Sequence, residues 1–389
     1  MTTTETNDKK PTKASALKII ANILRKPITG SILAILAAAL VGGVILIAAG
    51  HNPIQAYIGL FYGAVGQPRF IVHTIVASTA LILTGLSVTF AYKTGLFNIG
   101  VEGQFIVGTI AAVFLGYFVS LPPVIHPIVV MLGAMLVAGV FGAIVGFLKA
   151  RFNIHEVLSS IMLNWVAINL LNLYLGVEAF RRTGSNSAHS IQNSASIILF
   201  HEMKRTSEGI AQLRESEILS ELVLRTDLNF GIFIAIATVL LAKFILDKTS
   251  LGYTLKAVGS NKDAAEFAGI NIKRYMILSM FISGAIAGLA AAVHITGVSP
   301  NTITMLGGFQ NFGFNGIPVA LLSNAAVIPN IFSALLFGGM NYGSGYIQSR
   351  YQIPTETIDI MIGLIVFFVA LRAICIIIAD KIELRKGVQ

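Results

Sequence analysis

The stretch that decides the fold is residues 275–297, YMILSMFISGAIAGLAAAVHITG, which contains no Asp, Glu, Lys or Arg. A transmembrane helix needs about 20 consecutive, predominantly apolar residues, and this run has that length. Similar runs occupy residues 28–49, 71–91, 96–119, 124–149, 153–177, 229–247 and 357–379. We therefore expect an all-α polytopic membrane protein.

A further apolar stretch, 313–346, is interrupted by Pro329 and Asn330. We interpret it as two shorter helices, 313–327 and 331–346, because proline lacks the amide donor that a continuous helix needs. With them the chain has about ten transmembrane helices.

The composition excludes most other classes of protein. Of the 389 residues, 55% are hydrophobic and 12% are charged, and the mean hydropathy is +0.80. Soluble domains carry about 25% charged residues. Disorder, a collagen-like fibre and a cytosolic enzyme are therefore excluded. The net charge of +9 comes mainly from short loops, which indicates membrane topology and contact with lipid rather than with nucleic acid.

The basic residues also predict the orientation. With ten spans, 19 of the 27 Lys and Arg residues fall in segments on the cytoplasmic side if both termini are cytoplasmic. We expect a basic N-terminus at 1–27, a transmembrane domain at 28–380 in the cell membrane, and a C-terminus at 381–389. The loop 178–228 is then external and the loop 248–274 cytoplasmic. The first apolar run is longer than the 7–15 residues or so of a signal peptide, so we expect an uncleaved span.

A weak internal symmetry supports a transport role. The blocks 71–177 and 275–379 each hold four predicted spans, and they enter the membrane from opposite sides. Each contains a Phe-Asn break, at Phe97-Asn98 and Phe314-Asn315. Inverted repeats with broken helices are typical of transporters.

The strongest local motif is YKTGLFNIGVEGQ at residues 92–104. Ionisable groups at membrane depth are costly and usually face the protein interior or water. Asn98, Glu102 and Gln104 therefore either face a solute pathway or build an interfacial turn in which Glu102 satisfies backbone N–H groups at a helix N-terminus. The sequence leaves both interpretations open.

The span 153–177 carries four polar or amphipathic side chains near one helical stripe, Asn164, Trp165, Asn169 and Asn172. They line a pathway or hold helices together by hydrogen bonds. Trp165 lies too deep to be an interfacial belt residue.

No motif for catalysis or for metal binding is found. Cys375 is the single cysteine, and the histidines are scattered without a second ligand at metal-binding spacing. The phosphate loop of ATPases and the motifs of hydrolases are absent from the sequence. We expect a chain that is not an enzyme, binds no metal or cofactor, and takes any ATP-derived energy from a partner.

The cytoplasmic loop predicts a short helix outside the membrane. Ser260 or Asn261 can cap a helix over 262–268, and Gly269 can end it. A helix this short cannot span a bilayer, so it lies along the membrane surface or docks on a partner.

Four motifs together resemble a known family. They are GLFNIGVEGQ at 95–104, EVLSSIMLN at 156–164, AVGSN at 257–261 with Gly269-Ile270, and GFNGIPVALL at 313–322. The chain resembles permease subunits of ABC importers of the branched-chain amino acid/ribose type. The first motif is most similar to that of the branch that takes up nucleosides.

The resemblance implies a ten-helix permease with the fold of vitamin-B12 importers. It implies a second permease, a different and shorter chain, together with cytoplasmic ABC ATPases that use ATP and Mg²⁺. It also implies an extracellular substrate-binding lipoprotein that delivers a nucleoside or a related sugar-containing solute. The alternative functions are a secondary transporter with Glu102 as its ion-coupling site and, less well supported, a membrane enzyme.

Two groups of site residues follow from these motifs. The expected substrate pathway contains Phe97, Asn98, Glu102, Gln104, Asn164, Phe314 and Asn315. The expected ATPase-coupling site contains Gly259, Asn261, Ala264, Ala265, Glu266 and Gly269.

Overall fold

The computed structural model describes residues 27–370, and within that range the secondary structure is helical, with three isolated β-bridges and no strand. Within residues 27–370, six helices are long and apolar enough to cross a membrane. They are α2 (Pro27–Ala48), α4 (Pro68–Tyr92), α5 (Val101–Phe118), α6 (Ile125–Phe152), α7 (Glu156–Gly176) and α13 (Ile272–Gly297). The protein is therefore a multi-pass membrane protein, as expected.

The chain divides into two compact units, residues 1–54 with 356–389, and residues 55–355. In the described part of the first unit, α2 packs against α16 (Glu356–Ala370). Both match predicted spans in position. The rest of the last predicted span, both predicted cytoplasmic termini and Cys375 lie outside the described residues.

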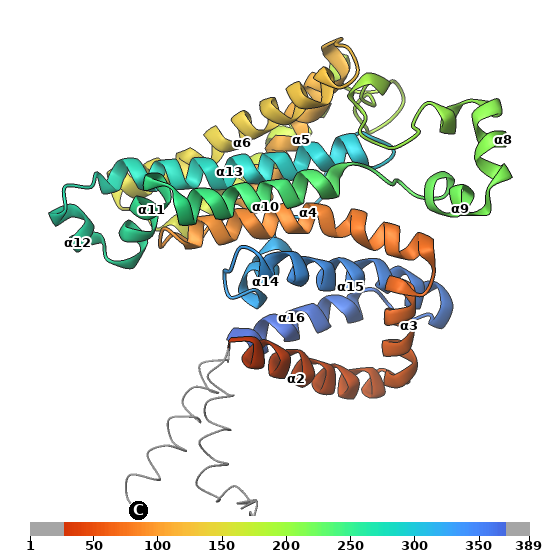
Figure 1. Ribbon diagram of the computed structural model, residues 1–389, viewed down its shortest axis with the longest axis horizontal. Helices are drawn as coiled ribbons and strands as arrows, with labels where there is room; N and C mark the ends of the chain where they lie inside the picture. Colours follow the sequence, from red (N-terminus) through yellow and green to blue (C-terminus); the bar gives the residue numbers. More distant parts are fainter. Residues whose placement is uncertain (1–26, 371–389) are drawn as a thin grey trace, which may run out of the picture. The chain divides into compact units, whose positions relative to one another are not determined.

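The centre of the second unit is α13, which packs on α4, α5 and α6 (Figure 1). Small residues allow the close approach of α13 to α6. A Cβ atom added at Gly284 would lie 2.5 Å from the Ala138 carbonyl oxygen, and one added at Gly288 would lie 2.3 Å from that of Ala134. Glycine and alanine at such spacing are the usual means by which membrane helices pack at short distance.

The apolar stretch 313–346 contains less helix than predicted. Pro329 begins α15 (Pro329–Tyr351), so the expected division at this proline is confirmed. The expected helix over 313–327 is reduced to α14 (Gly316–Leu322), about 10 Å long, which is too short to cross a bilayer. A further short helix, α3 (Pro53–Val65), was not predicted.

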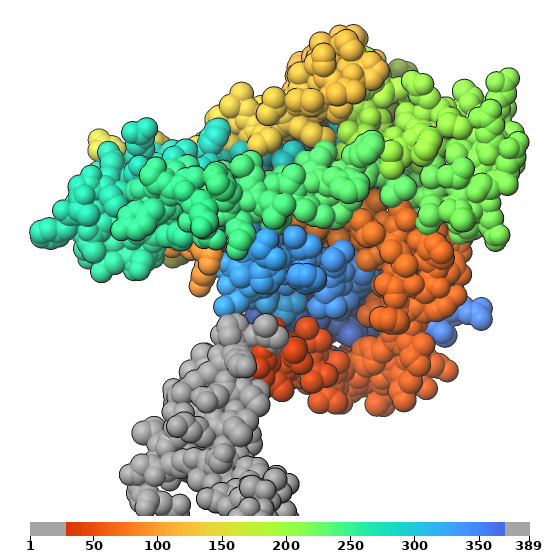
Figure 2. Space-filling model, in the orientation of Figure 1, coloured from red at the N-terminus to blue at the C-terminus, as the bar shows by residue number. Residues whose placement is uncertain are grey.

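The two long loops lie at opposite ends of the second unit (Figures 1 and 2). One end carries α11 (Ser250–Ser260) and α12 (Lys262–Phe267). The other end carries the 178–228 segment, with α8 (Ser207–Glu215), α9 (Glu217–Leu219), the π-helix η4 (Ser220–Leu224) and the 3₁₀ turns η1 (Glu178–Phe180), η2 (Asn193–Ala195) and η3 (Met203–Arg205). α10 (Gly231–Lys248) runs between the two ends.

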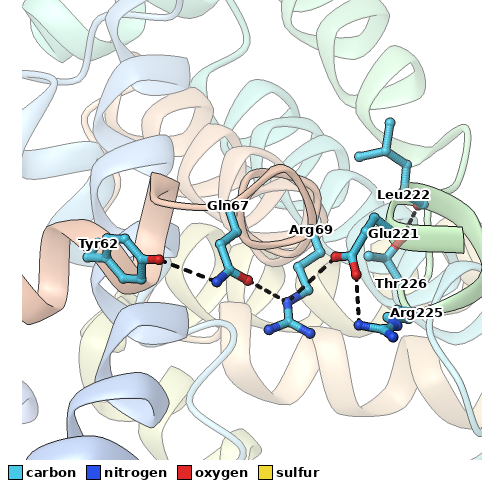
Figure 3. Close-up of polar contacts among 7 residues, drawn as sticks. All are labelled: Tyr62, Gln67, Arg69, Glu221, Leu222, Arg225 and Thr226. Atoms are coloured by element: carbon cyan, nitrogen blue, oxygen red, sulfur yellow. Dashed lines mark hydrogen bonds and ion pairs between the residues drawn. The ribbon is translucent and has the colours of Figure 1, made fainter. Parts of the chain in front are cut away.

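A chain of polar side chains ties the 178–228 segment to the start of α4 (Figure 3). The Gln67 amide donates to the Tyr62 hydroxyl at 3.3 Å, and Arg69 Nε donates to Gln67 Oε1 at 2.8 Å. Glu221 then pairs with Arg69 at 3.9 Å and with Arg225 at 2.7 Å. Partly exposed ion pairs contribute about 0–1 kcal/mol. These contacts therefore orient the 178–228 segment more than they stabilise it.

Candidate functional site

The helical structure is interrupted between α4 and α5, over residues 93–100, and we call this segment the break. Thr94 turns the chain: its hydroxyl donates to the Ala91 carbonyl at 2.7 Å and contacts the Ser279 hydroxyl on α13. Gly95 follows with φ +70°, a left-handed conformation that glycine adopts without strain. The predicted break is therefore present and is attached to α13.

Asn98 is the centre of a buried polar cluster inside this break. Its Nδ2 donates to Gln104 Oε1 and to Ser283 Oγ, each at 2.8 Å, and its Oδ1 accepts from the Gly100 amide at 2.9 Å. Ser283 in turn donates to the Ser87 carbonyl at 2.7 Å. These hydrogen bonds link α4, the break, α5 and α13 through four side chains: Ser87, Asn98, Gln104 and Ser283.

Glu102 is fully buried in the first turn of α5 and holds a distant segment. Its carboxylate accepts from the backbone N–H groups of Asn311 at 2.8 Å, Gly313 at 2.7 Å and Phe314 at 3.2 Å. Both oxygens are therefore occupied. This geometry matches the structural alternative considered for Glu102, except that the amides belong to the loop before α14 and not to α5.

Asn164 attaches α7 to the same break. Its Oδ1 accepts from the Gly103 amide at 2.8 Å, and its Nδ2 donates to the Ile99 carbonyl at 3.1 Å. The polar stripe expected on α7 is divided: Asn164 is buried, whereas Trp165 and Asn169 are exposed. Asn164 therefore holds helices together rather than facing an open space.

The structure brings the expected pathway residues together around the start of α5. Asn98, Glu102, Gln104 and Asn164 are buried and bonded to protein groups. Phe97 is half-buried against an apolar cluster of Val88, Val101, Ala287 and Ala320. Phe314 and Asn315 are half-buried next to the amides that Glu102 holds.

Sequence reasoning missed the serine and threonine members of this site. Ser87, Thr94, Ser279 and Ser283 are buried in the polar contacts between α4 and α13. Their positions within apolar spans could have indicated them, because serine and threonine are enriched where membrane helices contact each other.

The short helix predicted over 262–268 is present as α12, one residue shorter than expected. Asn261 caps it by accepting from the Ala264 amide at 3.0 Å, and Gly269 ends it with φ +79°. Ala264 and Glu266 are exposed, but Ala265 is buried within the chain. Ala265 therefore packs within the loop itself.

The helix before it, α11, was not predicted, and it connects the loop with the break. A Cβ atom added at Gly259 would lie 2.5 Å from the Lys93 carbonyl oxygen and 2.8 Å from the Gly95 nitrogen. The backbone of α11 thus lies directly on the 93–95 turn. The two predicted sites, the loop 248–274 and the break, are therefore in direct contact.

No metal centre is evident in the part of the chain that the structure describes. Within residues 27–370, no group of three or more His, Cys, Asp or Glu side chains could hold a metal ion.

Membrane-length helices and a buried polar break between two of them are features of membrane transport proteins. The chain belongs to the family of branched-chain amino acid transport system permease components, whose sequence model matches residues 70–370. It is accordingly a transport subunit and not an enzyme.

Named relatives are similar over most of their length. The guanosine ABC transporter permease protein NupP of Bacillus subtilis is 35% identical over 87% of this chain and 92% of its own. The nucleoside ABC transporter permease protein NupB of Lactococcus lactis is 34% identical over 92% and 94%. A second Bacillus subtilis protein, the guanosine ABC transporter permease protein NupQ, is 26% identical over 58% and 66%. No solved structure is significantly similar to the chain.

Proposed function

We propose that this chain is the permease subunit of an ATP-driven importer and forms the translocation pathway for nucleosides or a related sugar-containing solute. The observation that carries the proposal is the similarity to NupP and NupB along nearly the whole chain. The motif at 95–104, which indicated the nucleoside branch, spans most of the break and the first turn of α5.

The proposed complex contains three further kinds of subunit. A cytoplasmic ABC ATPase supplies ATP hydrolysis with Mg²⁺, because this sequence has no phosphate loop. A second, shorter permease completes the pathway; the similarity to both NupP and NupQ from one organism supports a pair of different permeases. An extracellular binding lipoprotein delivers the solute.

The proposed architecture is a ten-helix permease of the vitamin-B12-importer type with an inverted repeat and cytoplasmic termini. The placement of α12 and the 178–228 segment at opposite ends of one unit supports opposite sides of the membrane for these loops. A Thr206→Cys variant in a Cys375→Ser background should react with an impermeant thiol reagent from outside. Reaction only from the cytoplasmic side would contradict this topology.

Coupling is proposed to run through the loop and the break. Of the predicted coupling residues, Gly259 lies in α11 at the contact with the break, and the others form or flank α12: Asn261, Ala264, Ala265, Glu266 and Gly269. Phe267 is 95% exposed at the end of α12, which suits an apolar anchor in a groove of the ATPase. Movement of α11 is then transmitted to the 93–95 turn and from there to Asn98.

The proposed pathway residues take two roles. Asn98, Glu102, Gln104 and Asn164 stand directly behind the pathway and fix its shape, since their hydrogen bonds are already used. Phe97, Phe314 and Asn315 are half-buried and supply the surface next to them. The secondary-transport alternative is less well supported, because an ion at Glu102 would have to displace three backbone donors.

The experiment that tests the function is uptake in cells that lack the chromosomal gene. Complemented cells should accumulate labelled guanosine when an uncoupler is present and should fail when ATP is depleted. Uptake abolished by the uncoupler at normal ATP levels would support the secondary transporter instead. Uptake that does not depend on the gene would refute both.

A further inference from the structure

The loop 306–314 between α13 and α14 is held at both of its ends. At one end, Asn172 of α7 donates to the Leu306 carbonyl and accepts from the Leu306 amide, both at 2.9 Å. At the other end, Glu102 accepts from three amides between residues 311 and 314. Side chains from two different helices thus replace the regular backbone bonds that a loop inside a membrane protein lacks.

The middle of the loop is also anchored inward. Phe312 stacks on Phe105 at 5.1 Å between ring centroids and lies 4.5 Å from the His294 ring. Because the loop is fixed at three points, the positions of its other side chains are set by the fold.

The loop also brings aromatic rings together beside α7. Phe309 lies edge-to-face with Trp165 of α7, with 4.7 Å between ring centroids, and edge-to-face with Phe314 at 5.1 Å. Trp165 is 50% exposed, and Phe309 and Phe314 are half-buried. We call these three residues the aromatic shelf.

Anchoring at a membrane interface does not account for Trp165. Interfacial tryptophans lie near the ends of spans, whereas Trp165 is close to the middle of α7 (Glu156–Gly176). One turn further along the same face is Asn169, which is exposed and whose only side-chain hydrogen bond among the described residues is from its Nδ2 to the Trp165 carbonyl at 2.9 Å. A polar amide beside rigid aromatic rings is unfavourable against lipid and suits a solute that is flat and polar at its edges.

We propose that the aromatic shelf is a stacking site for the base of a nucleoside during its passage, and that Asn169 contacts the edge of the base. The proposal rests on the proposed function and adds the part of the solute that is recognised. Stacking suits this task because every base has a π-face and because each such contact is weak enough to be released.

The test is uptake of a purine and a pyrimidine nucleoside by the assembled transporter, at concentrations below saturation and normalised to permease abundance. Phe309→Ala and Trp165→Ala should lower purine uptake at least about fivefold, and pyrimidine uptake less, because the larger ring has more surface to stack. Phe309→Tyr and Trp165→Phe keep a ring and should stay within about twofold of the wild type. Phe332→Ala, which removes another exposed ring (70% exposed) from α15, is the matched control and should have no effect.

Three results would overturn the proposal. Wild-type uptake of both solutes in the two Ala variants would show that the aromatic shelf does not bind the base, and it would leave the proposed function intact. Equal loss of both solutes, with the ring-preserving variants equally impaired, assigns these residues to packing. A wild-type transporter that takes up no nucleoside refutes the proposed function, and the shelf with it.

Discussion

Glu102→Gln is the most informative single change in the buried break, because it keeps the shape of the side chain and removes one acceptor atom. In the wild type, Oε1 accepts from the Asn311 amide, and Oε2 accepts from those of Gly313 and Phe314. Glutamine places an NH₂ group at one of these two positions. Whichever way the amide turns, at least one backbone N–H then faces another donor.

The cost follows from the number of bonds lost. A hydrogen bond to a charged group contributes about 1.5–3 kcal/mol, and a buried donor without a partner costs about 1–3 kcal/mol. The variant loses one or two such bonds and weakens the remainder. We expect the loop 306–314 to detach more easily by about 2–4 kcal/mol, which corresponds to an opening equilibrium at least about thirtyfold larger.

Hydrogen exchange of the purified protein measures this opening directly. Peptides that cover residues 306–315 should exchange at least about thirtyfold faster in Glu102→Gln than in the wild type, while peptides of α13 remain unchanged. Glu208→Gln, in the exposed part of α8, is the matched control and should leave exchange unaltered. Wild-type protection of 311–314 in the Glu102 variant would refute the role assigned to this carboxylate.

Three further changes test other parts of the structure. Gly259→Val forces side-chain atoms onto the 93–95 turn beneath α11. The variant should insert normally, but its rate of solute-stimulated ATP hydrolysis should fall at least about tenfold. Gly345→Val is the control, because an added Cβ atom there has no neighbour within 4 Å, and it should leave this rate unchanged. Phe267→Ala should weaken co-purification of the ATPase by about thirtyfold or more in affinity, the usual cost of losing a buried aromatic anchor; undiminished co-purification would exclude this anchor. Burial, together with two neighbouring basic side chains, lowers the pKa of His201 below its usual 6.5, so the unfolded segment binds more protons. The stability of the 178–228 segment should be complete above pH 6.5 and should fall on acidification below it, and this dependence should be reduced in His201→Gln when melting is followed between pH 7 and pH 5.

The parts of this fold that depend on local signals could be predicted from the sequence. The helix at 262–268 was recognised from its cap and its terminal glycine, and Asn261 and Gly269 perform those roles. Long apolar runs gave the positions of the membrane helices within a few residues, because the bilayer sets their length. α11 was missed because its cap, Thr249, follows directly on the end of α10.

The parts that depend on distant contacts could not be predicted. Glu102 lies 209 residues from Asn311 in the sequence, and nothing near either residue indicates the other. The stretch 313–327 is apolar enough for a helix, but its first residues are held as a loop by that carboxylate. Composition alone cannot distinguish an apolar helix from an apolar loop whose backbone is satisfied by side chains.

The central claim, ATP-driven uptake of a nucleoside through this permease, is tested most directly by reconstitution. The permease, its partner permease and the ATPase are placed in proteoliposomes with the binding protein outside and labelled guanosine as the solute. We predict accumulation that requires ATP on the ATPase side and is abolished when the phosphate-loop lysine of the ATPase is replaced. Accumulation driven by a proton or sodium gradient in the absence of ATP would contradict the account.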